Sequence, residues 1–360
     1  MSTEPTAGAD GETIIRVDGR AGRITLNRPQ ALNALTYTQI VAIRAALDAW
    51  RADDAVKLVI LDATGGRALC AGGDVIAMYE SRTDGGAFAT RYWRDEYRLN
   101  AEIGGWPKPF VALMDGIVMG GGIGLSGHAS HRIVTEASML AMPETTIGLV
   151  PDVGGSWLLA QAPGRMGEYL GLIGERMGAA DAIYAGFADT HVARASLDGL
   201  LARLVDPDGE PVGVTISRHA SAPAAPTHAP RQADVDRMFA GDSVEAIAAA
   251  LAASPLEWAG KAADALAKRS PLALKLTLAA IRRARGMRAL EQALAMEFRL
   301  TTRLFRHGEF IEGVRALLVD KDKSPRWRPA ALAGVDAAMI SEFLSALPDG
   351  ADRPFPEEDR

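Results

Sequence analysis

The sequence is poor in the features that mark several classes of protein. Its 360 residues include one cysteine, Cys70, which excludes an internal disulfide framework and suits a small buried hydrophobe. Lysine and arginine number 39 against 45 aspartates and glutamates, so the net charge of −6 argues against nucleic acid as the main partner. No run of about 18 uncharged apolar residues is present, so we expect no membrane span.

The composition that remains is that of an ordinary soluble protein. Hydrophobic residues make up 48% and charged residues 23% of the chain, enough to bury a sizeable core. Residues 1–12 are polar and acidic, without the basic and apolar regions of a signal peptide or the arginines of a transit peptide. We therefore expect a flexible N-terminus over 1–12 and a cytoplasmic protein.

Apolar segments and amphipathic segments alternate along the first two hundred residues, which predicts an α/β core over 13–204. The expected strands are 14–17, 21–26, 58–61, 110–114 and 131–135, with a first helix over 36–51. Residues 205–232 are expected as a linker or mobile loop, 233–345 as a helical C-terminal region and 346–360 as a tail. Within that region the expected helices are 235–252, 255–268, 271–285 and 287–307.

Two carboxylates lie among glycine, proline and apolar residues in the segment 142–155. Glu144 follows Pro143, and Asp152 follows Pro151 eight residues later. An unpaired carboxylate is costly to bury, so acids in such a setting are candidate general bases or nucleophiles with raised pKa values. A plain loop with both acids solvated is the alternative.

Two glycine-rich turns could bring backbone N–H groups close to a ligand oxygen. One is Gly120-Gly121-Gly122 and the other is Gly72-Gly73, and each is expected to follow a strand. Residues 122–127 also match the Gly-x-Gly-x-x-Gly pattern of dinucleotide-binding folds. That pattern requires an acid at the end of a second strand, whereas Glu144 opens a loop, so we do not favour a dinucleotide site.

Other catalytic patterns are missing. No His-Glu-x-x-His or Cys-x-x-Cys motif occurs, so we expect no metal. Ser126 lacks the final glycine of a nucleophile elbow. His128 and His131, close to the glycines, are interpreted as structural or solvated residues.

Together these segments resemble the crotonase (enoyl-CoA hydratase/isomerase) superfamily. The resemblance runs from about Thr13 to Trp327, and its first part, residues 24–35, looks like the superfamily's coenzyme A contact segment. It is most similar to a subgroup of thioester hydrolases, over residues 95–100, 142–155 and 309–327. It implies a spiral of ββα units with a helical C-terminal region. Only the region of about 206–241 has no recognisable counterpart.

The resemblance also implies roles for individual residues. The N–H groups of Gly73 and Gly121 would bind the thioester oxygen, and Glu144 would be the catalytic glutamate. Asp152 would assist in catalysis, and Glu96 and Asp152 would contact the acyl hydroxyl or water. The expected coenzyme A contacts are Ala31, Leu32, Ala34, Ala71 and Gly72.

The reaction implied is hydrolysis of a short β-hydroxyacyl-CoA thioester, with 3-hydroxyisobutyryl-CoA as the best candidate, which would place the chain in valine breakdown. Glu144 would either activate water or attack the thioester carbon to give a transient anhydride, and the sequence leaves both open. Coenzyme A is then part of the substrate and no cofactor is expected. Superfamily members commonly form trimers or hexamers, so a homo-oligomer is the expected assembly.

Two alternatives remain at this point. Hydratases of the superfamily carry a second glutamate just after the glycine run, where this chain has Gly124. That departure argues against an enoyl-CoA hydratase or isomerase. A non-catalytic subunit that binds coenzyme A would not need a buried carboxylate and is the other alternative.

Overall fold

The computed structural model describes residues 6–7, 11–347 and 355. Most of the expected N-terminal segment 1–12 and tail 346–360 lies outside these residues, so both stay predictions. The chain divides into two compact units that alternate along the sequence. Unit 1 comprises Met1–Asp74, Leu99–Leu140 and Met177–Thr227, and unit 2 comprises Val75–Arg98, Ala141–Arg176 and His228–Arg360. The expected boundary near residue 204 is therefore not where the units divide.

Within the described residues, unit 1 contains a seven-stranded sheet of order β1-β2-β3-β4-β6-β8-β10. The first three strands pair antiparallel and the pairs from β3 to β10 are parallel, as expected when helices connect the strands. The strands are β1 (Thr6–Ala7), β2 (Thr13–Asp18), β3 (Ala21–Leu26), β4 (Leu58–Ala63), β6 (Phe110–Met114), β8 (His131–Val134) and β10 (Thr190–His191).

A second sheet has three strands in the order β5-β7-β9, namely β5 (Ala68–Cys70), β7 (Ile117–Met119) and β9 (Met139–Ala141). β5 and β7 run parallel, with a register shift between Ala68 and Cys70. The helices of unit 1 are α1 (Tyr37–Arg51), α4 (Gly121–Ser126), α7 (Ala179–Tyr184), α8 (Leu197–Val205) and α9 (Val212–His219). Thr36 caps α1 through a reciprocal capping box with Gln39, at the start of the helix expected over 36–51.

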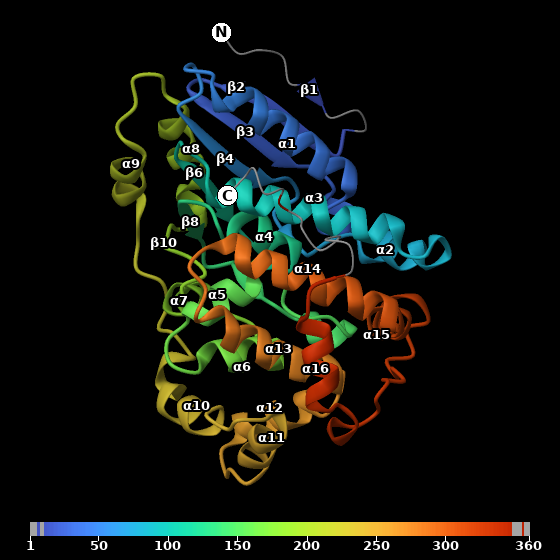
Figure 1. Ribbon diagram of the computed structural model, residues 1–360. Helices are drawn as coiled ribbons and strands as arrows, with labels where there is room; N and C mark the ends of the chain where they lie inside the picture. Colours follow the sequence, from blue (N-terminus) through green and yellow to red (C-terminus); the bar gives the residue numbers. More distant parts are fainter. Residues whose placement is uncertain (1–5, 8–10, 348–354, 356–360) are drawn as a thin grey trace. The chain divides into compact units, whose positions relative to one another are not determined.

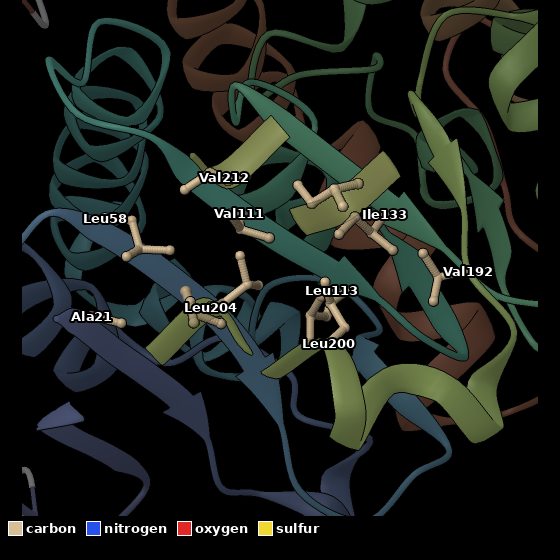
Figure 2. Packing of buried hydrophobic residues seen from close by; sticks show 11 residues of the cluster. Ala21, Leu58, Val111, Leu113, Ile133, Val192, Leu200, Leu204 and Val212 are labelled. Atoms are coloured by element: carbon tan, nitrogen blue, oxygen red, sulfur yellow. The ribbon is translucent and has the colours of Figure 1, made fainter. Parts of the chain in front are cut away.

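A cluster of buried aliphatic side chains covers one face of the large sheet (Figure 2). Leu58, Val111 and Ile133 come from three neighbouring strands, and Leu200 from α8 is buried with them. Val212, on α9, belongs to the same cluster, although residues 205–232 were expected as a linker or mobile loop. The expectation missed this helix because the alanine- and proline-rich stretch that follows it dominates the composition.

The described part of unit 2 is mainly helical (Figure 1). It includes most of α3 (Ala87–Gly104), which continues into unit 1. Its other helices are α2 (Val75–Glu80), α5 (Gly155–Gln161), α6 (Met166–Ile173), α10 (Gln232–Met238), α11 (Val244–Ala252), α12 (Glu257–Leu266), α13 (Pro271–Ala284), α14 (Leu290–His307), α15 (Glu309–Val314) and α16 (Ala337–Leu344).

The structure corrects one expected helix and adds another. The segment 235–252, predicted as one helix, is two, because the chain turns at Gly241 and Ser243 then caps α11 by accepting a hydrogen bond from Ala246 N. α3 was not predicted at all, although it carries Glu96. No helix in the described ranges is long and apolar enough to cross a bilayer.

Candidate active site

In unit 1, the two glycine turns follow neighbouring parallel strands. β5 ends at Cys70, just before Gly72 and Gly73, and β7 ends where the second glycine run begins. The carboxyl ends of adjacent parallel strands meet at one edge of a sheet, so both turns leave the sheet together. A Cβ added at Gly72 would lie 3.8 Å from the carbonyl oxygen of Met119. The structure therefore brings together two turns that are almost fifty residues apart in sequence.

The backbone of Gly73 is oriented by a single parallel bridge. Leu35 donates its N–H to Gly72 O and accepts the N–H of Asp74, both at 2.8 Å. In this parallel bridge the N–H and C=O of Leu35 bond to the residues on either side of Gly73, so the N–H of Gly73 points away from Leu35. Gly73 thus presents a backbone N–H at the turn, and its role as an oxyanion donor stays a prediction.

Gly121 is the first residue of α4, and the N–H of a first helical residue has no acceptor within its helix. Gly120, just before it, has φ 46° and ψ −120°, a conformation that side chains oppose. A Cβ on Gly122 would overlap the carbonyl oxygen of Cys70, so this position packs against the other turn. The hydroxyl of Ser126 donates to Gly122 O at 2.6 Å, an intrahelical role that agrees with its exclusion as a nucleophile.

The expected coenzyme A contacts also lie in unit 1, around a buried asparagine. The side-chain amide of Asn33 makes hydrogen bonds of 2.8 to 3.0 Å to three backbone groups. This holds Leu32 and Asn33 at positive φ, and Ala34 N donates to Ala31 O at 3.1 Å. Ala71 N donates to Leu32 O at 3.1 Å, so the first segment lies against the glycine turn.

In unit 2, Glu144 opens a single helical turn, η3 (Glu144–Ile147). Its carbonyl oxygen accepts the N–H of Gly148, which ends the turn with φ 71°. A Cβ at Gly148 would overlap the carbonyl oxygen of Glu309, so η3 packs tightly against α15. This packing fixes the direction in which Glu144 leaves the backbone.

Glu144 and Glu96 each have one buried carboxyl oxygen without a hydrogen-bond partner among the described residues. Oε2 of Glu144 and Oε1 of Glu96 are buried and bond to nothing in the described part of the chain, and the residues are 5% and 2% exposed. Burial raises the pKa of both well above its usual value, and the charge of Asp152 raises both further. An orphaned buried oxygen costs about 1–3 kcal/mol, so two together point to a functional site.

Asp152 is also buried, but its carboxylate accepts a hydrogen bond. The hydroxyl of Tyr97, on α3, donates a hydrogen bond of 2.6 Å to Oδ2 of Asp152. Burial raises the pKa of Asp152 to about 6, against the lowering effect of the Tyr97 bond and of its own backbone N–H. The negative charge of Asp152 raises the pKa values of Glu96 and Glu144, so Asp152 is the first of the three to ionise as pH rises.

Sequence reasoning missed two further members of this cluster, Tyr97 and Glu297. Both are fully buried in unit 2. Glu297 could have been found, because it interrupts the apolar face of α14 between Ala293 and Leu300. Tyr97 gave no such signal, since a buried tyrosine in a helix is ordinary.

Residues 21–344 match the model of a protein family described as enoyl-CoA hydratase/isomerase. The chain belongs to the enoyl-CoA hydratase/isomerase family. This confirms the superfamily that the sequence motifs predicted.

A Danio rerio member named 3-hydroxyisobutyryl-CoA hydrolase, mitochondrial, is 40% identical, over 94% of this chain and 91% of its own. Two solved members of the family share the fold. A carnitinyl-CoA dehydratase from Mycobacterium thermoresistibile is 43% identical with a TM-score of 0.90, over 94% of this chain and 97% of that one. An enoyl-CoA hydratase from Rhodobacter sphaeroides 2.4.1 is 45% identical with a TM-score of 0.89, over 96% of this chain and 99% of that one. The predicted crotonase-type α/β fold is confirmed.

One prediction is contradicted. The curated family members carry the word mitochondrial in their names, so the expectation of a cytoplasmic protein was wrong by this comparison. That expectation depended on the composition of residues 1–12 alone.

Proposed function

We propose that the chain hydrolyses the thioester of a short β-hydroxyacyl-CoA, with 3-hydroxyisobutyryl-CoA as the substrate. The observation that carries the proposal is the pair of buried, unpartnered carboxyl oxygens of Glu144 and Glu96 beside the ionisable Asp152. The names of the curated relatives support it. The pathway that follows is the breakdown of valine.

Glu144 is the proposed reacting carboxylate. In one route it removes a proton from water, and the water oxygen attacks the thioester carbon. In the other it attacks that carbon itself, coenzyme A leaves as the thiolate, and water cleaves the resulting anhydride. Both routes pass through a tetrahedral oxyanion, for which the N–H groups of Gly73 and Gly121 are the proposed donors.

Glu96 and Asp152 are the proposed contacts of the acyl hydroxyl and of water. The unpartnered Oε1 of Glu96 is an acceptor that suits an alcohol O–H. Asp152, already oriented by Tyr97, remains an acceptor for a second donor. The proposed coenzyme A contacts are Ala31, Leu32, Ala34, Ala71 and Gly72.

A second candidate, hydration of an enoyl-CoA, is favoured by the names of the two solved structures. Against it is Gly124, buried within α4, where hydratases carry their second glutamate. Without that second carboxylate, protons cannot be delivered and removed on both sides of a double bond by the pattern those enzymes use.

The deciding experiment follows two signals on one panel of thioesters, namely free thiol and the absorbance of the enoyl group. We expect thiol release from 3-hydroxyisobutyryl-CoA, and no loss of enoyl absorbance with crotonyl-CoA. Isobutyryl-CoA, which lacks the hydroxyl, is the matched control and should be cleaved at least about 100-fold more slowly. Hydration of crotonyl-CoA without thiol release would support the second candidate. Binding with no reaction would support a non-catalytic subunit.

A further inference from the structure

Glu297, on α14, reaches the turn that carries Asp152. Its carboxylate accepts the N–H of Gly154 at 2.7 Å, the N–H of Ser156 at 2.9 Å and the hydroxyl of Ser156. The side chain is fully buried. Three hydrogen-bond donors therefore converge on this one carboxylate, and hydrogen bonds to an ionised acceptor are the strong ones.

The turn that Glu297 holds is strained. Val153 has φ 54° and Gly154 has φ 80°, and a β-branched residue at positive φ is a true outlier. Gly155 N closes the turn by donating to Asp152 O at 2.6 Å. Strain of this kind costs on the order of 1–3 kcal/mol and persists only where the surroundings enforce it. Glu297 supplies that enforcement on the residues directly after Val153.

The same face of α14 also supports the side-chain partner of Asp152. Thr301 lies one turn after Glu297, and its hydroxyl is 3.5 Å from the hydroxyl of Tyr97. Phe298 packs edge-on against the Tyr97 ring, with centroids 6.2 Å apart. One helix therefore orients both the backbone and the hydrogen-bond partner of Asp152.

Glu297 also interacts electrostatically with the other carboxyls of the cluster. Burial raises its pKa to about 7, against the lowering effect of the Ser156 and Gly154 bonds, and the charge of Asp152 adds to the rise. Its own charge raises the pKa values of Glu144 and of Tyr97. The titratable groups that face it are thus Tyr97 of α3, Glu144 of η3 and Asp152 of the turn.

We propose that Glu297, through Ser156 and Gly154, is a positioning residue that fixes Asp152 in the geometry needed for hydrolysis at Glu144. This inference rests on the proposed hydrolase function. Because Glu297 acts through Asp152 and not on the substrate, its loss should affect kcat more than KM.

The test compares three variants in 3-hydroxyisobutyryl-CoA hydrolysis. Glu297→Gln should lower kcat about 100-fold with little change in KM, the size of effect that a misplacement of about 1 Å produces. It also removes a negative charge that raises the pKa of Glu144, so the acid limb of the kcat/KM profile should move to lower pH. Ser156→Ala removes one hydrogen bond to a charged group, so kcat should fall about tenfold. The variant keeps the charge of Glu297, so the acid limb should stay in place.

Glu168→Gln is the matched control. Glu168 is a fully buried glutamate in the same unit, but it pairs with Arg285 away from the cluster. Its variant should lose stability while kcat per folded molecule and the pH profile stay at the wild-type level. A Glu297→Gln variant that behaves like this control overturns the proposal. If Glu297→Gln does not fold, an unchanged kcat in Ser156→Ala overturns it instead.

Hydrogen exchange separates this inference from the proposed function. At least one of the Gly154 and Ser156 amides should exchange at least about tenfold faster in Glu297→Gln than in Glu168→Gln, because glutamine keeps only one of the two acceptor oxygens. If the wild type releases no thiol, the hydrolase function fails, and the exchange rates still decide the positioning claim. Equal exchange rates in the two variants contradict it.

Discussion

Tyr97 donates a hydrogen bond of 2.6 Å to Asp152, and neither side chain is appreciably exposed to solvent. The bond stabilises the ionised form of Asp152 and lowers a pKa that burial raises. An ionised carboxylate is thereby kept next to two carboxyls, Glu96 and Glu144, whose pKa values are raised well above the usual range. Environments that separate the pKa values of neighbouring acids are what acid–base catalysis requires.

Removing this bond should move the pH dependence of activity. In Tyr97→Phe the pKa of Asp152 rises, so a higher pH is needed to ionise it and the acid limb of kcat/KM shifts upward. We expect kcat to fall between about 10- and 100-fold, the value of a hydrogen bond to a charged group. Tyr169→Phe removes a buried hydroxyl that bonds to Arg231 and Glu175 outside the cluster, and its pH profile should match the wild type. Equal profiles for both variants would contradict the role of Tyr97.

The cluster should lower stability at neutral and higher pH. The pKa of Asp152 is raised from 3.8 to about 6 and that of Glu297 from 4.5 to about 7, so the folded state binds protons more tightly than the unfolded chain. Their stabilising contribution is fully present below their pKa values in the unfolded chain. It is lost as pH rises through the folded-state values of about 6 and about 7. Glu144 shifts in the same direction.

Glu144→Gln removes one of these groups and tests the sign. Thermal melts between pH 4 and pH 8 should show a variant that gains stability over the wild type as pH rises. A difference that shrinks with rising pH would mean that Glu144 is stabilised as the carboxylate in the folded protein.

Substitutions at the adjacent residues Gly121 and Gly122 should affect activity and stability differently. Gly122→Ala drives a Cβ into the carbonyl oxygen of Cys70, so we expect a lower melting temperature with normal kcat in the folded fraction. Gly121→Val crowds the proposed oxyanion donor and should reduce kcat about 100- to 1,000-fold, the effect of losing one such donor. Measuring kcat per folded molecule alongside a thermal melt separates the two. A normal kcat in Gly121→Val would remove Gly121 from the oxyanion hole.

Gly124→Glu should not create an efficient hydratase. The whole of α4 is buried, and the new carboxylate would have no supporting hydrogen bonds selected to orient it. We expect crotonyl-CoA hydration, measured by the loss of enoyl absorbance, to stay near the background rate. Activity close to that of ordinary hydratases would show that this one residue separates the two reactions.

Much of unit 1 could be predicted from the sequence because its strands are regular. The alternating and β-branched segments gave β2, β3, β4, β6 and β8 to within two residues, and Thr36 marked the start of α1. β5 was missed because it has three residues and an irregular register with β7. The glycine turns were nevertheless recognised, since only glycine tolerates such close backbone approach.

The carboxylate cluster was predicted less completely. Glu144 and Asp152 stood out in their apolar segment, and Glu96 came from a resemblance to known proteins. Glu297 lies 145 positions after Asp152 in the sequence, and no local pattern links α14 to that turn. Contacts of such long range depend on how the helices pack, which spacing alone does not determine.

The central claim is that Glu144 performs thioester hydrolysis, and one comparison tests it most directly. Thiol release from 3-hydroxyisobutyryl-CoA is measured for the wild type and for Glu144→Gln, with binding of the thioester measured in parallel. We predict rapid release by the wild type, release at least about 1,000-fold slower in the variant, as when a catalytic group is removed, and similar binding by both. A Glu144→Gln variant that keeps more than about a tenth of the wild-type rate would contradict the account, because losing an essential base or nucleophile costs far more than that.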